Sequence, residues 1–247
     1  MKTDYKKVFA ACSSLAAGIV GYKLYQNQIA KKRIKQFKLS VKERFSSSQN
    51  ILILGDSVAR GCGSTNGGFG SYLVDLLQKE TNKNFTLTNL GVDGLTSSGL
   101  VDIINKKETR ELIIQSEIIV LNIGGNDLLE HFVSGGPLKL IKKFRNTKKA
   151  FKKNLLYIKE TINTINPNAV LIANGLYNPC EESYEYFLVA ERLVKLWNKT
   201  FACLDGVIVN TSDLSKDRSH WDDDIHPNEE GYKNLANIIY MELAKFI

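Results

Sequence analysis

Four short motifs hold the residues that could do chemistry in this chain of 247 residues. They are Gly55–Asp56–Ser57, Asn89–Leu90–Gly91, Gly124–Gly125–Asn126, and the run from Asp223 to His226. A serine hydroxyl is a poor nucleophile at neutral pH and needs an adjacent base. His226 can take the proton of Ser57, and Asp223, three residues earlier, can hold the other imidazole nitrogen. The set indicates nucleophilic attack on an ester carbonyl.

Such an attack creates an oxyanion, and three of the residues can donate hydrogen bonds to it. They are Ser57 and Gly91, through their backbone N–H groups, and Asn126, through its side-chain amide. One such donor typically lowers the barrier by about 3–4 kcal/mol. Asp56 is expected to make structural hydrogen bonds, and Asp222 or Asp224 stays an alternative to Asp223 as the partner of His226.

The elements that must position these residues alternate along the chain. Apolar runs typical of buried strands cover residues 50–55, 85–90, 117–123, 169–173 and 206–210. Helical spacing runs through residues 72–77 and covers residues 97–115, 137–165, 182–202 and 228–247. This alternation predicts an α/β domain with a five-stranded parallel sheet covered on both faces. Ligands bind beyond the carboxyl ends of such strands, which is where the motifs stand.

In kind and order the motifs resemble the four blocks of the SGNH/GDSL hydrolases. GDS stands at 55–57, Gly91 within NLGVDG, GGND at 124–127 and DDIHP at 223–227, so the resemblance spans residues 50–247. It implies a three-layer α/β/α flavodoxin-like fold and a serine esterase or thioesterase that needs no metal or organic cofactor. One departure is Val58–Ala59, where the motif that names the family has Leu–Ser.

The resemblance also assigns roles to the residues. It makes Ser57 the nucleophile, His226 the base and Asp223 its orienting carboxylate, with Ser57, Gly91 and Asn126 as the oxyanion hole. The substrates that it implies are carboxylic esters or thioesters, including lipid-derived ones. A carbohydrate O-acetyl esterase of the same mechanism is the alternative. Residues 130–136 and 177–182 are the candidates for the walls of the acyl pocket.

Two classes of function without this chemistry fit the residues less well. A non-catalytic ligand- or metal-binding module could use the acidic run around residues 222–226, but it would leave Ser57 and Asn126 unexplained. A nucleotide-binding loop is disfavoured because Gly61–Cys62–Gly63 is not followed by the third glycine of the dinucleotide fingerprint. Cys180 and Cys203 are expected to be small buried hydrophobic residues.

The net charge of +7 is concentrated at the N-terminus. The first 45 residues hold eleven bases and two acids, whereas the other 202 hold 22 bases and 24 acids. A slightly acidic body argues against a nucleic-acid partner. Within the body, residues 139–153 hold eight bases and no acid, which indicates either a solvated helix face or a contact with anionic lipid.

The basic segment also contains an apolar run. Residues 8–22 are uncharged, and a snorkelling Lys23 would extend the run to residue 25, close to the roughly 20 residues that span a bilayer. We therefore predict an N-terminal segment 1–45 with a single-pass cell-membrane anchor over about residues 8–25, followed by a hydrolase domain 46–247. The bases after the run favour a cytoplasmic-facing domain. A cleaved signal peptide and an amphipathic lead-in helix remain alternatives, and the oligomeric state is not predicted.

Overall fold

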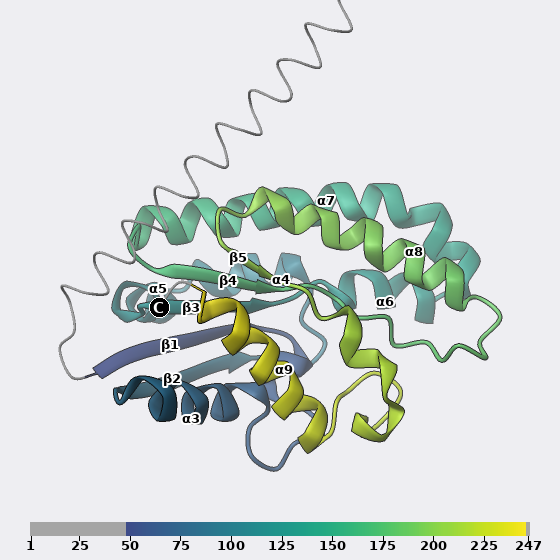
Figure 1. The fold of residues 1–247 in the computed structure, drawn as a ribbon. Helices are drawn as coiled ribbons and strands as arrows, with labels where there is room; N and C mark the ends of the chain where they lie inside the picture. Colours follow the sequence, from purple (N-terminus) through teal and green to yellow (C-terminus); the bar gives the residue numbers. More distant parts are fainter. Residues whose placement is uncertain (1–47, 246–247) are drawn as a thin grey trace, which may run out of the picture. The chain divides into compact units, whose positions relative to one another are not determined.

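The computed structural model describes residues 48–245 of the chain. Its strands form a parallel sheet in the order β2-β1-β3-β4-β5, which confirms the predicted five-stranded α/β fold (Figure 1). The strands are β1 (Ser48–Gly55), β2 (Asn84–Gly91), β3 (Ile118–Asn122), β4 (Val170–Asn174) and β5 (Val207–Val209). Because β2 and β3 lie on opposite sides of β1, the chain changes direction there, and Gly55 pairs with both Gly91 and Asn122. Ligands of open parallel sheets bind at such a switch point.

Helices cover both faces of the sheet, as expected for buried parallel strands. Alternate residues of β1 face opposite layers. Ile51 and Ile53 pack with α3 (Phe69–Thr81) and α9 (Glu229–Leu243). Leu52 and Leu54 belong to the core on the other side. That side is covered by α4 (Ser97–Ile104), α5 (Lys107–Gln115), α7 (Gly136–Ile165) and α8 (Phe187–Asn198).

Two of the expected helices have other bounds in the structure, and one helix of the structure was not expected. The segment 97–115 is two helices, because Lys106 has an extended backbone at the start of α5. The segment 182–202 becomes α-helical only at Phe187, because two turns precede it. The Tyr184 N–H donates to the Glu181 carbonyl in the first turn, and the Phe187 N–H donates to the Tyr184 carbonyl in the second. The segment ends in the 3-10 helix η1 (Lys199–Cys203). Residues Gly125–Val133, for which the sequence predicts no helix, form the helix α6.

The predicted membrane anchor over about residues 8–25, its alternatives and its orientation concern residues outside the described range. Within residues 48–245, no helix combines the length and the apolar character that crossing a membrane requires. The described residues 48–245 belong to one compact unit.

Candidate active site

The position of Ser57 follows from the tight junction between β1 and the short helix α2 (Ser57–Arg60). A Cβ at Gly55 would overlap the carbonyl oxygen of Asn122, so only glycine lets the end of β1 approach β3 so closely. Asp56 caps α2 by accepting a hydrogen bond from the Val58 N–H at 3.1 Å. Ser57 is thus the first helical residue, where a backbone N–H has no partner inside the helix.

The structure brings Ser57, His226 and Asp223 together in one line of contacts. His226 Nε2 lies 2.9 Å from Ser57 Oγ, and His226 Nδ1 lies 2.7 Å from Asp223 Oδ2. With Nδ1 protonated, the imidazole donates to Asp223 and accepts the Ser57 hydroxyl. Asp223, rather than Asp222 or Asp224, therefore holds the ring, as the spacing predicts.

Asp223 is held as a carboxylate. Partial burial opposes its ionisation, but hydrogen bonds from the His226 ring and from the Ile225 and His226 N–H groups outweigh that cost and lower its pKa. The two N–H groups donate to Asp223 Oδ1 at 2.8 and 2.7 Å. An ionised Asp223 can stabilise the imidazolium that forms when His226 takes a proton.

Several backbone and side-chain hydrogen bonds hold the loop that carries His226. Trp221 and Pro227 form an antiparallel bridge, and the Asp222 N–H donates to the His226 carbonyl at 2.9 Å. The Tyr177 hydroxyl donates to the Ile225 carbonyl at 2.7 Å from the loop after β4. These contacts fix the backbone on both sides of the imidazole.

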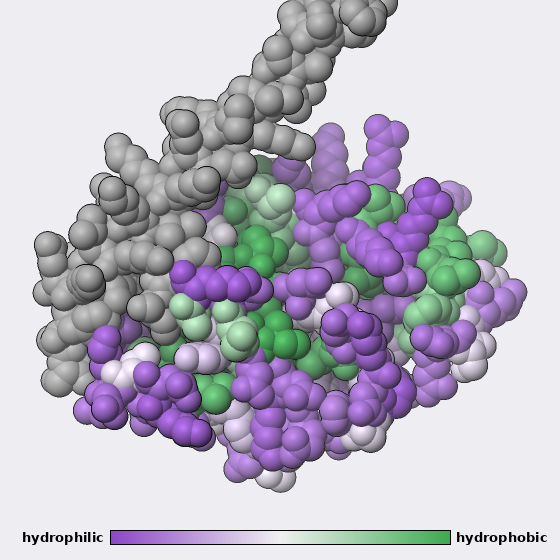
Figure 2. Space-filling view, viewed as in Figure 1, coloured by the Kyte–Doolittle hydropathy of each residue, from purple (hydrophilic) through white to green (hydrophobic). Residues whose placement is uncertain are grey.

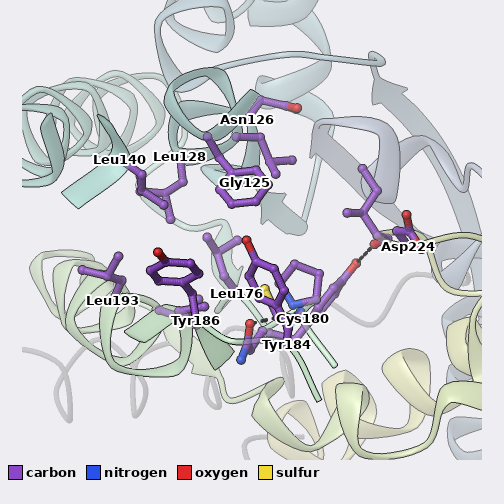
Figure 3. Close-up of a pocket in the computed structure, with 18 of the residues that line it drawn as sticks. Gly125, Asn126, Leu128, Leu140, Leu176, Cys180, Tyr184, Tyr186, Leu193 and Asp224 are labelled. Atoms are coloured by element: carbon purple, nitrogen blue, oxygen red, sulfur yellow. Dashed lines mark hydrogen bonds between the residues drawn. The ribbon is translucent and has the colours of Figure 1, made fainter. Parts of the chain in front are cut away.

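Asn126 lies in the first turn of α6 and contacts the loop that follows β2. Its Nδ2 donates to the Leu95 carbonyl at 3.0 Å, which leaves one amide hydrogen for a ligand. Asp127 anchors the same turn by accepting from the Ser97 N–H and hydroxyl. Burial raises the pKa of Asp127, although the two hydrogen bonds from Ser97 oppose the shift. Asn126 lines the same pocket as Ser57, where Figure 3 shows it at the rim beside Gly125, and its role as an oxyanion donor stays a prediction.

Gly91 does not match its predicted role. Its N–H donates to Asn89 Oδ1 at 2.9 Å, and a Cβ at this position would overlap the backbone of Arg60. The glycine thus lets the end of β2 pack against α2 and does not offer its N–H to a ligand. Gly94, with φ of 71° and open space around its Cβ position, lies next to Leu95 and so is the glycine adjoining Asn126.

A buried polar chain lies beneath the nucleophile. Asn122 Nδ2 donates to Asp56 Oδ1 at 3.0 Å, and Asn174 Nδ2 donates to Asn122 Oδ1 at 3.1 Å. Burial raises the pKa of Asp56 to about 6 even though its hydrogen bonds oppose the shift. The structural role expected of Asp56 is confirmed. Asn122 and Asn174 were missed, and the available signal was a single polar residue ending each apolar strand.

A cavity of about 590 Å³ extends from Ser57 and His226 between α6, α7 and α8. Figure 3 shows Leu140, Leu193 and Tyr186 grouped at one end, away from Asp224. Its apolar lining includes Leu128, Phe132, Pro137, Leu140, Ile141, Leu176, Tyr177, Tyr184, Tyr186, Val189, Leu193 and Val194.

The predicted walls of this pocket are correct in part. Segment 177–182 contributes its first five residues, whereas segment 130–136 contributes only Phe132. The contribution of α7 and α8 was missed. Cys180 lines the cavity, and both it and Cys203 are half-buried rather than fully buried. Burial raises the pKa of both thiols. Within the described part of the chain, no group of three or more His, Cys, Asp or Glu residues could hold a metal ion.

Known proteins share both the sequence pattern and the fold. Residues 53–233 match the GDSL-like Lipase/Acylhydrolase family. The uncharacterized protein YpmR of Bacillus subtilis (strain 168) is 26% identical over 207 residues, covering 79% of this chain and 81% of that protein.

Solved structures that resemble the fold include the lipase Lip_vut3 from a goat rumen metagenome, with a TM-score of 0.71, 21% identity, and coverage of 78% of this chain and 97% of that one. The acetylxylan esterase Axe2 of Geobacillus stearothermophilus has a TM-score of 0.59 and 16% identity, covering 79% of this chain and 94% of its own. With the family match extending over most of the chain, this protein belongs to the GDSL-like lipase/acylhydrolase family and is a hydrolase acting on esters.

Proposed function

We propose that this protein is a serine esterase that cleaves acyl esters, lipid-derived ones included, through an acyl-enzyme on Ser57. The observation that carries the proposal is the contact line from Ser57 Oγ through His226 to Asp223, with distances of 2.9 and 2.7 Å. Both Ser57 and His226 line the apolar cavity, so a bound acyl chain lies next to the nucleophile.

The reaction follows from the positions of these groups. Ser57 Oγ attacks the ester carbonyl while its proton passes to His226 Nε2, and the oxyanion accepts hydrogen bonds from the Ser57 N–H and Asn126 Nδ2. Collapse breaks the ester bond, and the leaving alcohol takes the proton from His226. Water then attacks the acyl-enzyme, giving one proton to His226, which returns it to Ser57 Oγ as the acid departs.

The size and lining of the cavity support acyl groups longer than acetyl. About 590 Å³ lies within the range of pockets that hold drug-sized ligands, whereas an acetyl group has only two carbons. The same attack would cleave thioesters. Carbohydrate O-acetyl ester hydrolysis is the second candidate, favoured by the structural likeness to an acetylxylan esterase.

A panel of nitrophenyl esters from acetate to palmitate tests the proposal on the full chain. We expect kcat/KM to rise from acetate to medium or long chains. Ser57→Ala should lose roughly 10⁴-fold or more in kcat. Ser212→Ala, an exposed serine in the 3-10 helix η2 (Ser212–Lys216), is the matched control and should keep wild-type turnover. A wild-type chain that cleaves no ester and forms no fluorophosphonate adduct would refute the proposal, and a preference for acetate would favour the second candidate.

We also propose that segment 1–45 tethers the enzyme to the cell membrane with the catalytic domain on the cytoplasmic side. Its excess of bases and its uncharged run from residue 8 to residue 22 support this. Fractionation of cells that express the full chain should recover it with membranes after an alkaline wash. Recovery in the soluble fraction would rule out the anchor.

A further inference from the structure

The outer side of the pocket carries apolar side chains that face solvent. Val133, at the end of α6, is 82% exposed, and Leu138, in the first turn of α7, is 72% exposed. Each is the neighbour in sequence of a residue that lines the pocket, Phe132 and Pro137 respectively. Ile141 itself lines the pocket and is also 44% exposed to solvent. The rim formed by the α6–α7 connection is therefore apolar inside and outside.

The exposed face of α7 continues from this rim as a line of bases. Leu138, Lys142, Arg145, Lys149 and Lys152 follow one another at spacings of three and four residues, which puts them on one side of the helix. The four bases are all exposed. Figure 2 shows hydrophilic side chains standing out from α7 and hydrophobic surface at the end of the molecule where α7 and α8 begin.

The charge on this face is not neutralised along its own helix. Residues 131–159 contain no Asp or Glu. Burial lowers the pKa of Lys148, and the charges of Lys199 and Lys152 lower it further, so bases here repel one another. Glu181, in the turns before α8, lines the pocket and also pairs with Arg218, and the exposed Glu130 lies in α6 one turn before Val133. Because the exposed bases of α7 outnumber these two acids, an anionic partner would approach from the α7 side.

We infer that the α6–α7 rim and the basic face of α7 form a docking surface for an anionic lipid bilayer. Val133 and Leu138 enter the boundary between headgroups and acyl chains, while Lys142, Arg145 and Lys149 contact lipid phosphates. This inference rests on the proposed function, since it places the apolar pocket against the phase that holds lipid esters. A nucleic acid would also attract the bases, but it leaves Val133 and Leu138 without an apolar partner.

The test uses the full chain, so that segment 1–45 is constant in every comparison. Lys142→Gln/Arg145→Gln/Lys149→Gln removes three bases from the face. Its matched control, Lys79→Gln/Lys216→Gln/Lys245→Gln, also removes three exposed bases. These lie in α3, in η2 and just after α9, away from α7. Sedimentation with phosphatidylcholine vesicles, with and without phosphatidylglycerol, measures binding. Each base near an anionic surface contributes roughly fivefold to partitioning, so the first variant should bind anionic vesicles roughly 100-fold more weakly and the control much less so.

A second pair tests the apolar contacts. Val133→Ser/Leu138→Ser should also weaken vesicle binding, whereas Ile114→Ser/Met241→Ser, which alters two residues of similar exposure elsewhere, should not. None of these residues lines the pocket, so every variant should hydrolyse a soluble nitrophenyl ester like the wild type. The two docking variants should lose hydrolysis only of an ester presented in anionic vesicles.

Three results would overturn the inference. Equal losses in the docking and control triple variants would show that net charge alone governs binding. Undiminished vesicle binding by both docking variants would show that the surface does not touch lipid. Loss of binding to an RNA oligonucleotide with vesicle binding intact would assign the bases to nucleic acid. Failure of the proposed function gives a different pattern, because no chain, wild type included, would then hydrolyse the soluble ester.

Discussion

The two ends of the cavity are built in different ways. At the nucleophile, short loops follow strands β1, β3 and β4, and polar groups are tied to one another, from Asn174 through Asn122 to Asp56. At the far end, helices supply side chains such as Leu140 and Leu193, which pack without directional bonds. Hydrogen bonds specify positions within a few tenths of an ångström, whereas apolar walls specify volume and tolerate variation in shape. The reaction should therefore be sensitive to single polar atoms and the substrate range to bulk.

Among the changes that test this contrast between the two ends, the largest effect is expected where a single amide at the polar end is removed. Asn126→Ala should lower kcat by roughly 10²–10³-fold with little change in KM, because the lost hydrogen bond is made to the oxyanion and not to the ground-state ester. Steady-state kinetics on a soluble ester measures both constants. Asn146→Ala, at an exposed site on α7, is the control. A loss confined to KM would mean that Asn126 only binds substrate.

That amide also illustrates how far sequence patterns reach. Ser57, Asp223, His226 and Asn126 were predicted because each follows a strand or precedes a helix, and the ends of parallel strands share one edge of the sheet. The oxyanion-hole role predicted for Gly91 does not fit the structure, for a reason that residue spacing cannot reveal. Its N–H is satisfied by the side chain of Asn89, two residues away, and that bond depends on a local backbone conformation.

The apolar end was predicted less well because its residues are distant in sequence. Phe132, Leu140 and Leu193 lie on three helices, and apolar periodicity marks a buried face without naming what the face encloses. Periodicity also extended α8 too far back, since Tyr184 and Tyr186 fit a helical stripe but stand in turns that line the cavity. Residue types that do chemistry identify themselves, whereas residues that form a wall need the tertiary structure.

The second expected effect concerns stability at the polar end. The pKa of Asp56 is about 6 in the folded state against an ordinary value of 3.8, so the folded state holds the extra proton between those values. Stability from this group is therefore present below about pH 4 and is lost as pH rises through 6, by about 3 kcal/mol in all. Asp223, with a lowered pKa, acts in the opposite direction at more acidic pH.

Asp56→Asn keeps an oxygen that can accept from Val58 and Asn122 but removes the charge. The free energy of unfolding of the wild type, relative to this variant, should fall by about 2.5 kcal/mol between pH 4 and pH 7. Urea denaturation across that range measures the difference. Asp75→Asn, at an exposed position on α3, should run parallel to the wild type. Parallel curves for Asp56→Asn as well would show that burial does not shift this carboxyl.

The smallest effect is expected at the apolar end, and it should depend on the substrate. Leu193→Trp adds bulk where Leu140 and Tyr186 close the cavity, so long acyl chains should lose roughly tenfold or more in kcat/KM while acetate is unaffected. Leu156→Trp on the exposed side of α7 is the control for adding an indole to the surface. The ester panel reports the ratio of palmitate to acetate. An equal loss for all chain lengths would mean that the indole had displaced the Ser57 loop, and the two ends of the cavity would then be mechanically coupled rather than separately specified.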